Sequence, residues 1–241
     1  MTDHHLVIAT PMRDGMVSGV HHASTWEVVR GPVEIIDPKL LLTDSIVLAR
    51  SRAVRLFLQK TEGTHLLFWD ADVEGSAEAL EIMLAEGLDY IAATYPKKHL
   101  DPDGQCRDFA LYTRGETVAF EGNHARVAGV GLGFTLLTRQ LLSQMWLQYE
   151  DELHAYDDGD RYVALFAQVF APNSKGLRVH YPEDYSFCSR LPPSCPCAML
   201  TTHVLAHHGQ HLYRASPAAL WTPRAPAQAP APSPSSPPGR P

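Results

Sequence analysis

One stretch of the chain, residues 64–73, constrains the fold more than any other. It reads Thr-His-Leu-Leu-Phe-Trp-Asp-Ala-Asp-Val, an apolar run that ends in two carboxylates separated by one residue. No Pro or Gly interrupts the run, which is typical of a buried strand in a parallel sheet covered on both faces. Side chains alternate along a strand, so Asp70 and Asp72 are expected to point the same way.

Two carboxylates at the end of a buried strand are costly unless a cation lies beside them. In open α/β sheets the carboxyl ends of the strands are also where ligands bind. The Asp70-x-Asp72 pair therefore indicates a divalent metal with oxygen ligands. The alternative is that Asp70 caps the following helix and Asp72 is solvated.

The stretches before and after this strand alternate between strand and helix patterns. Short apolar runs predict strands, and three- and four-residue apolar spacing predicts helices between them. The expected strands cover residues 6–10, 33–37, 64–70 and 89–94, and the expected helices cover 20–29, 45–59 and 76–85. Asp44 or Ser45 is the expected N-cap of the second helix, and Gly87 is expected to close the third. This order predicts an α/β, Rossmann-like domain with a mostly parallel central sheet.

The pattern changes after Lys98. A strand-like run that contains Gly131 and Gly133 covers residues 127–138, and further strands are expected at 162–170 and 200–206. Helices are expected at 140–148 and 182–190, and the acidic segment 150–161 is expected to be a solvated loop. Residues 215–241 are mostly Pro, Ala and Ser, so we expect one domain over residues 1–214 and a disordered tail over 215–241.

The composition fits a globular enzyme or binding domain. The 241 residues are 45% hydrophobic and 20% charged, which allows one sizeable core. The formal net charge of −7 argues against a protein that binds nucleic acid electrostatically over its whole surface. No apolar run is long enough to span a membrane, and the N-terminus lacks a signal-peptide pattern, so we expect a cytoplasmic protein.

The cysteines do not predict a zinc site. Three of the four crowd together late in the chain, at Cys188, Cys195 and Cys197. Cys195 and Cys197 are separated by one residue, whereas zinc knuckles use about two to four. Buried thiols in a reducing compartment are the expected state.

Two further polar groups are candidates for chemistry. His207, His208 and His211 follow a predicted strand and provide a candidate metal ligand, or else a surface histidine cluster. Glu183 and Asp184 open a predicted helix, where one of them is a candidate general base. Their alternative role is to complement the helix dipole without any function.

A glycine pair and an arginine extend this set. Gly131 and Gly133 lie inside a strand-like run, where glycine marks either a simple bulge or a close approach by ligand. Arg50 lies on the second predicted helix, where it could pair with a diphosphate or belong to a solvated face. No P-loop pattern and no Gly-x-Ser-x-Gly elbow is present, which disfavours P-loop nucleotide hydrolases and the usual esterases.

The order of these motifs resembles that of GT-A fold glycosyltransferases, in particular a small class common in bacteria and phages. The resemblance covers roughly residues 6–213. It runs from the strand ending in Thr-Pro, through Arg-Ser, Phe-Trp-Asp-Ala-Asp, Tyr-Pro-Lys-Lys, Gly-Leu-Gly-Phe and Glu-Asp-Tyr, to the late histidines. The Pro- and Cys-rich segment after Arg190 departs from the family pattern.

The resemblance implies roles for individual residues. Asp70, Asp72 and His207 would hold Mn²⁺ or Mg²⁺ against the diphosphate of a nucleotide sugar. Asp184 or Glu183 would act as base on the acceptor hydroxyl, or only orient the substrate if the reaction retains configuration. The residues implied to contact the donor are Thr10, Pro11, Arg50, Asp70, Lys97, Gly131 and Gly133.

The predicted function is therefore metal-dependent transfer of a sugar from a nucleotide-diphosphate sugar to a hydroxyl. The acceptor stays open between a glycan, a protein, a lipid, a small molecule and modified DNA. Two alternatives remain: a non-catalytic module that binds a nucleotide or sugar, and a nucleotidyltransferase on a similar sheet. The latter normally carries a glycine-rich basic loop after its first strand, and here that loop has only Arg13 and Gly15.

Overall fold

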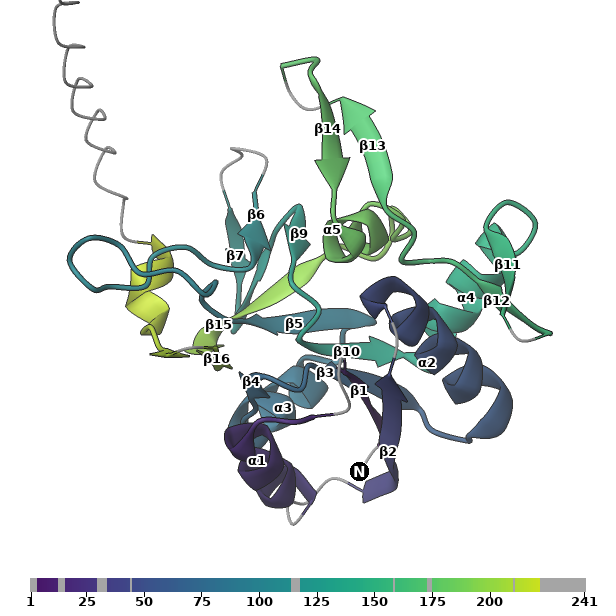
Figure 1. Cartoon of the computed structure of the whole chain (residues 1–241), viewed down its shortest axis with the longest axis horizontal. Coiled ribbons are helices and arrows are strands. Elements are labelled where there is room, and N and C mark those ends of the chain that lie inside the picture. The colour runs from purple at the N-terminus through teal and green to yellow at the C-terminus, as the bar shows by residue number, and fades with distance from the viewer. Residues whose placement is uncertain are drawn as a thin grey trace, which may run out of the picture.

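The computed structural model describes residues 4–12, 16–29, 34–43, 45–113, 118–157, 159–172, 175–209 and 211–221. Within them, eight strands form a central sheet in the order β2-β1-β3-β10-β5-β15-β8-β7 (Figure 1). These strands are β1 (His5–Met12), β2 (Glu34–Thr43), β3 (His65–Trp69), β5 (Tyr90–Thr94), β7 (Ala119–Glu121), β8 (His124–Arg126), β10 (Phe134–Thr138) and β15 (Ala198–Val204). The helices are α1 (Gly19–Val29), α2 (Ile46–Lys60), α3 (Ala77–Glu86), α4 (Arg139–Tyr149) and α5 (Glu183–Cys188).

The predicted α/β class is confirmed, and six of the eight strands of the central sheet run in the same direction. β1 is parallel to both β2 and β3, and β5 is parallel to β15. The sequence did not predict that β10 enters between β3 and β5 and is antiparallel to both. The run expected as one strand, residues 127–138, forms β9 (Gly129–Val130) and β10, which belong to different sheets.

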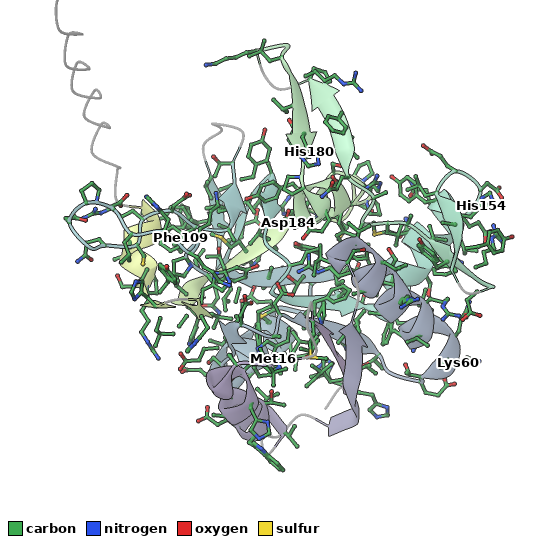
Figure 2. The ribbon with its side chains drawn as sticks, in the orientation of Figure 1. Met16, Lys60, Phe109, His154, His180 and Asp184 are labelled. Carbon is green, nitrogen blue, oxygen red and sulfur yellow. The ribbon has the colours of Figure 1, made fainter. Side chains whose placement is uncertain are left out.

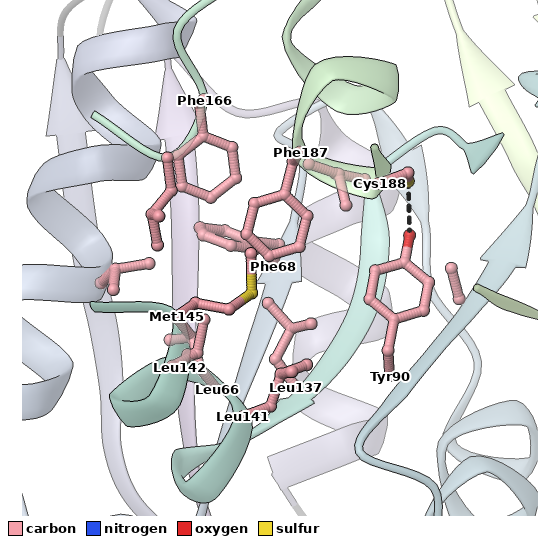
Figure 3. Packing of buried hydrophobic residues seen from close by; sticks show 14 of the residues in the cluster. Leu66, Phe68, Tyr90, Leu137, Leu141, Leu142, Met145, Phe166, Phe187 and Cys188 are labelled. Carbon is pink, nitrogen blue, oxygen red and sulfur yellow. Dashed lines mark hydrogen bonds between the residues drawn. The ribbon is translucent and has the colours of Figure 1, made fainter. Parts of the chain in front are cut away.

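Helices cover both faces of the sheet, and β3 contributes side chains to the hydrophobic core on each face. Leu66 and Phe68 pack into the cluster that includes Phe57 of α2 and Met145 of α4. Leu67 and Trp69 pack into the other cluster, with side chains of α1 and α3. A strand buried on both faces needs an apolar residue at every position, which is why the run carries no polar break. Figure 3 shows the first cluster, where Phe166 stacks on Phe187 at 4.7 Å between ring centroids.

The helix boundaries follow local signals. The Ser45 side chain accepts a hydrogen bond from the Leu48 N–H at the start of α2, and Ser76 does the same for α3. Gly87 ends α3 with a φ of 63°, a left-handed conformation that favours glycine. The alternative N-cap Asp44, like Arg13 and Gly15, lies outside the described residues.

Smaller elements surround the sheet. They are β4 (Val73–Glu74), β6 (Leu111–Tyr112), β11 (His154–Asp157), β12 (Asp160–Val163), β13 (Val169–Pro172), β14 (Arg178–Tyr181), β16 (Ala206–His208), β17 (Leu212–Tyr213) and a 3-10 helix, η1 (Pro217–Trp221). β16 pairs with β4 at the carboxyl end of β3, and the β13–β14 hairpin projects from α5 away from the sheet (Figure 1).

Several expected boundaries were wrong. β1 continues through Pro11 to Met12, because its pairing with β2 extends that far. The acidic segment expected as a loop contains the β11–β12 hairpin, and the strand expected at 162–170 is interrupted by a turn after Val163. Residues 217–221, expected in the tail, form η1, and Trp221 packs edge-on against Phe120. Residues 222–241 lie outside the described residues. Among the described helices, none has the length and apolar character to cross a membrane.

Candidate active site

A cavity of about 850 Å³ opens at the carboxyl ends of β1 and β3. This volume falls in the range of about 300–1,000 Å³ typical of small-molecule sites. The end of β1 contributes Pro11, and Asp70 and Asp72 follow β3 directly. The lining residues are Pro11, Met12, Met16, Val17, Ser18, Ser45, Ile46, Asp70, Ala71, Asp72, His208 and Gly209. Thr10, expected to contact the donor with Pro11, is 4% exposed and is not one of these lining residues.

The structure brings His207 to Asp72. β16 pairs antiparallel with β4, with His207 opposite Val73. This register puts the His207 Nε2 atom 3.5 Å from Asp72 Oδ2. The other ring nitrogen, Nδ1, lies 2.9 Å from the carbonyl oxygen of Pro96. A carbonyl only accepts, so Nδ1 carries a proton and the ring orientation is fixed with Nε2 toward the carboxylate.

The three candidate histidines have different surroundings. His207 faces Asp72, whereas His208 lines the cavity and its backbone N–H donates to the Asp72 carbonyl at 2.7 Å. The buried Nε2 of His208 has no hydrogen-bond partner among the described residues. His211 is exposed and lies against Tyr213, with 6.1 Å between ring centroids. Of the three, His207 has the position that a metal ligand beside Asp72 requires.

Arg50 does not point into the cavity but joins the two acidic motifs. Its Nη2 donates to both carboxylate oxygens of Asp70, at 2.9 and 3.0 Å, and its Nη1 donates to Glu183 Oε1 at 2.8 Å. The side chain is only 2% exposed. Burial opposes the charge of Arg50, but Asp70 and Glu183 outweigh it and raise the pKa of the guanidinium. The charged side chain therefore links the end of β3 to the start of α5.

The two lysines after β5 have different partners. Lys97, expected near the phosphates, has its Nζ 3.2 Å from Asp108 Oδ1. Lys98, which sequence reasoning passed over, forms an ion pair with Asp72. Burial raises the pKa of Asp72, but hydrogen bonds from His207 and Lys98 outweigh it and lower that pKa to about 2. Asp72 is thus a carboxylate with two cationic or hydrogen-bonding neighbours at the cavity wall.

The predicted metal ligands are only partly assembled. Among the described residues, no group of three His, Cys, Asp or Glu side chains converges as a metal site would. Asp72 and His207 present one oxygen and one nitrogen donor side by side, and the carboxylate oxygen is the donor that suits Mn²⁺ and Mg²⁺, with phosphate and water oxygens to complete the shell. Asp70 instead directs both oxygens at Arg50.

The acidic pair on α5 is divided between two environments. Glu183 is bonded to Arg50, while Asp184 accepts a hydrogen bond from the Tyr185 N–H at 2.8 Å. Burial, reinforced by the neighbouring Glu183 charge, raises the pKa of Asp184 to about 6. Asp184 lies at the start of α5, beneath the hairpin that carries His180 (Figure 2). A carboxyl group with this pKa is suited to exchange protons near neutral pH.

The glycine pair makes room for a tyrosine. A Cβ placed on Gly131 or Gly133 would lie 2.7 or 2.6 Å from the hydroxyl oxygen of Tyr95. The Gly133 N–H donates to that hydroxyl at 3.1 Å, and the Tyr95 ring packs edge-on against His207 at 4.9 Å. Burial, with the nearby Asp70 charge, raises the pKa of Tyr95. Sequence reasoning assigned the glycines to ligand contact, and neither lines the cavity.

Another residue that sequence reasoning missed supports the end of β3. His21 of α1 is 5% exposed, and its Nδ1 lies 3.0 Å from the Asp70 carbonyl oxygen. Its ring packs edge-on against Trp69. No sequence signal distinguishes His21 from the other twelve histidines, because its role depends on a contact between α1 and β3.

No protein-family model and no curated protein sequence matches the chain. Among solved structures, A197 from STIV is similar over 86% of each chain, at 22% identity and a TM-score of 0.49. Mannose-1-phosphate geranyltransferase from Thermus thermophilus is similar over 62% of this chain and 61% of that chain, at 16% identity and a TM-score of 0.38. 4-Diphosphocytidyl-2C-methyl-D-erythritolsynthase from Anaerococcus prevotii is similar over 65% of this chain and 81% of that chain, at 10% identity and a TM-score of 0.35. Similarity at this level assigns no activity to the chain.

Proposed function

We propose that the protein is a metal-dependent glycosyltransferase that moves a sugar from a nucleotide-diphosphate sugar to a hydroxyl acceptor. One observation carries the proposal. Asp72 lines a cavity of suitable size and lies 3.5 Å from His207, whose ring is fixed by the Pro96 carbonyl. Histidines that bind metals typically donate their other ring N–H to a carbonyl or carboxylate, as His207 does to Pro96.

Asp72 and His207 would hold Mn²⁺ or Mg²⁺, with diphosphate oxygens and water as further ligands. When bound, such a cation supplies Lewis acidity that neutralises the negative charge of a leaving diphosphate. Lys98 forms an ion pair with Asp72 and so brings a further positive charge beside the proposed cation ligands. Asp70 is not needed as a ligand, because it is the partner of Arg50.

The cavity would take the nucleoside diphosphate part of the donor. Pro11 and Ser45 line it beside β1 and α2, and Asp72 and His208 line it next to the cation ligands. The buried Nε2 of His208, without a partner among the described residues, is available for a polar group of a ligand. A donor bound here would direct its diphosphate toward Asp72.

Asp184 would act as the base that accepts the proton of the acceptor hydroxyl. Its raised pKa, about 6, leaves it ionised yet basic at neutral pH. Glu183 is held by Arg50 and so serves as an anchor for α5. This division assigns the base role to Asp184 alone. The acceptor can be a glycan, a protein, a lipid, a small molecule or modified DNA.

The test is cation-dependent binding of nucleoside diphosphates. UDP, GDP, ADP and CDP are titrated into the protein by calorimetry, with and without Mn²⁺, and compared with Asp72→Asn. Asp160 is an exposed residue of the β11–β12 hairpin that pairs with Arg55 of α2, and Asp160→Asn provides the matched control. We expect Mn²⁺ to strengthen binding of one diphosphate in the wild type and in D160N, and to have no effect in D72N.

Turnover separates an enzyme from a binding module. The nucleotide sugars of the diphosphate that binds are incubated with the protein and Mn²⁺, and release of the diphosphate is measured. Slow hydrolysis that D184N and D72N both abolish supports a transferase. Cation-dependent binding without any release from every such donor would favour a non-catalytic module, and equal Mn²⁺-dependent binding in D72N would refute the proposed cation site.

A further inference from the structure

A second cavity, of about 380 Å³, lies where α5 meets the start of β15, and three of the four cysteines line it. Its lining residues are Thr113, Val118, Ala119, Arg126, Val127, Ala128, Cys188, Leu191, Pro192, Pro193, Cys195, Pro196 and Cys197. The proposed transfer reaction uses none of these thiols. The cavity gives small molecules a route to side chains that are otherwise buried.

Two of the thiols are in contact. Cys197 Sγ donates a hydrogen bond to Cys188 Sγ across 3.8 Å, and both cysteines are free. A disulfide bond needs a sulfur separation of about 2.05 Å, so the two atoms would have to approach by less than about 2 Å. The chain between the two cysteines contains three prolines and a turn, and Pro193 and Ser194 within it are exposed.

The surroundings make one sulfur the better nucleophile. The hydrogen bond from the Cys197 thiol lowers the pKa of Cys188 by more than burial raises it. The Tyr90 hydroxyl, 3.4 Å from the Cys188 sulfur, lowers this pKa further (Figure 3). Burial raises the pKa of Cys197, and it raises that of Cys195 to about 11. Thiolates and not thiols attack oxidants, so reaction should begin at Cys188.

We propose that Cys188 and Cys197 form a peroxide-sensitive dithiol that oxidises to an intramolecular disulfide. The Cys188 thiolate attacks one oxygen of hydrogen peroxide, the O–O bond breaks, and with one proton taken up a sulfenic acid and water result. The Cys197 thiol then attacks the sulfenic sulfur, forming the S–S bond and releasing a second water. Two thiols are oxidised by two electrons and one peroxide is reduced to two waters.

The bond would form between two elements of the candidate active site. Cys188 ends α5, which begins with Glu183 and Asp184, and Cys197 immediately precedes β15, which leads to His207 on β16. Residues 189–197 separate α5 from β15 along the chain. A covalent link at this point would tie together the ends of the two segments that carry the proposed base and the proposed metal ligand.

Peptide mapping tests the proposal directly. Native protein is treated with stoichiometric hydrogen peroxide, quenched by acid, alkylated under denaturing conditions and digested with trypsin. Trypsin cuts after Arg190, so Cys188 falls in the peptide 179–190 and Cys197 in the peptide 191–214. We expect these peptides to appear joined, with the mass of both less two hydrogens, and free thiols to fall from four to two. Dithiothreitol should restore all four.

Matched variants identify the partners. Cys195→Ser and Cys106→Ser should still form the joined peptide, and Cys197→Ser should instead leave Cys188 as a sulfenic acid that dimedone traps. A joined peptide in C197S, or a bond between Cys195 and Cys197 within one peptide, would overturn the assignment. So would full alkylation of Cys188 in the wild type under peroxide conditions that fully oxidise free cysteine.

Discussion

Replacing Arg50 by Met should destabilise the protein strongly, because it strips two carboxylates of their shared partner. The guanidinium is 2% exposed, and the side chains of Asp70 and Glu183 are 20% and 16% exposed. Removing one partner of a buried ion pair typically costs about 3–5 kcal/mol, because the remaining charge is left uncompensated. For a chain of this size that corresponds to a fall in Tm of about 6–20 °C.

Arg55 on the same helix provides the control. Its Nη1 pairs with Asp160 Oδ2 at 2.7 Å, but the Asp160 side chain is 60% exposed. Solvent screens such a pair, and its loss should cost about 0–1 kcal/mol. Arg55→Met removes the same number of atoms from α2 as Arg50→Met and keeps the same apolar stem. The difference between the two variants therefore isolates the buried ion pairs.

Urea and thermal unfolding, followed by circular dichroism, measure both variants. If the cost in R50M comes from unpaired carboxylates, then R50M/D70N should be more stable than R50M, because the neutral amide needs no counter-charge. Equal stability of R50M and R55M would refute the argument. So would a double variant that is no more stable than R50M, since the loss would then come from packing.

Three further predictions follow from the geometry. The pKa of the Asp184 carboxyl is raised to about 6, so donor turnover should fall as the pH drops through about 6 and the carboxylate is protonated; a flat pH profile would contradict this. D184N should lower kcat by about 10²–10⁴-fold at pH 7.5 without weakening diphosphate binding. Gly133→Ala should cost about 1–3 kcal/mol, because its Cβ would lie 2.6 Å from the Tyr95 hydroxyl, and Tyr95→Phe in the same chain should recover part of the loss in urea unfolding. Arg139→Met should lower stability by about 2–3 kcal/mol, since its guanidinium donates to four carbonyls at and after the end of α2, and an unchanged urea midpoint would show that water replaces it.

Local signals predicted much of the fold. The unbroken apolar run of β3 is sufficient to indicate a strand covered on both faces, and Ser45, Ser76 and Gly87 marked helix ends where the structure has them. The position of β10 could not be predicted in the same way. Its apolar residues would fit a sheet in either direction, and only pairing with the distant β3 and β5 makes it antiparallel.

In the candidate site, too, the sequence indicated some residues, whereas others depend on contacts between segments that are distant along the chain. The sequence indicated Asp72 and the group of late histidines, but the choice of His207 depends on the register between β16 and β4. Lys97 and Lys98 are neighbours in sequence, and pattern alone could not tell which one turns toward Asp72. Tyr95 gave no signal of its own, because the two glycines that accommodate it come from a separate part of the chain.

Arg50 changes the meaning of the Asp-x-Asp motif in this chain. Its guanidinium occupies both oxygens of Asp70, so the two aspartates that the strand pattern makes equivalent have different partners. Both aspartates line the cavity, but Asp70 belongs to the ion-pair network that fixes α5 on β3, whereas Asp72 lies beside His207 and Lys98. Substitution of Asp70 should therefore be felt mainly as lost stability, and substitution of Asp72 mainly as lost cation binding. Because Asp70 and Glu183 share one guanidinium, their substitutions should also be non-additive, which links the proposed donor and acceptor halves of the site energetically.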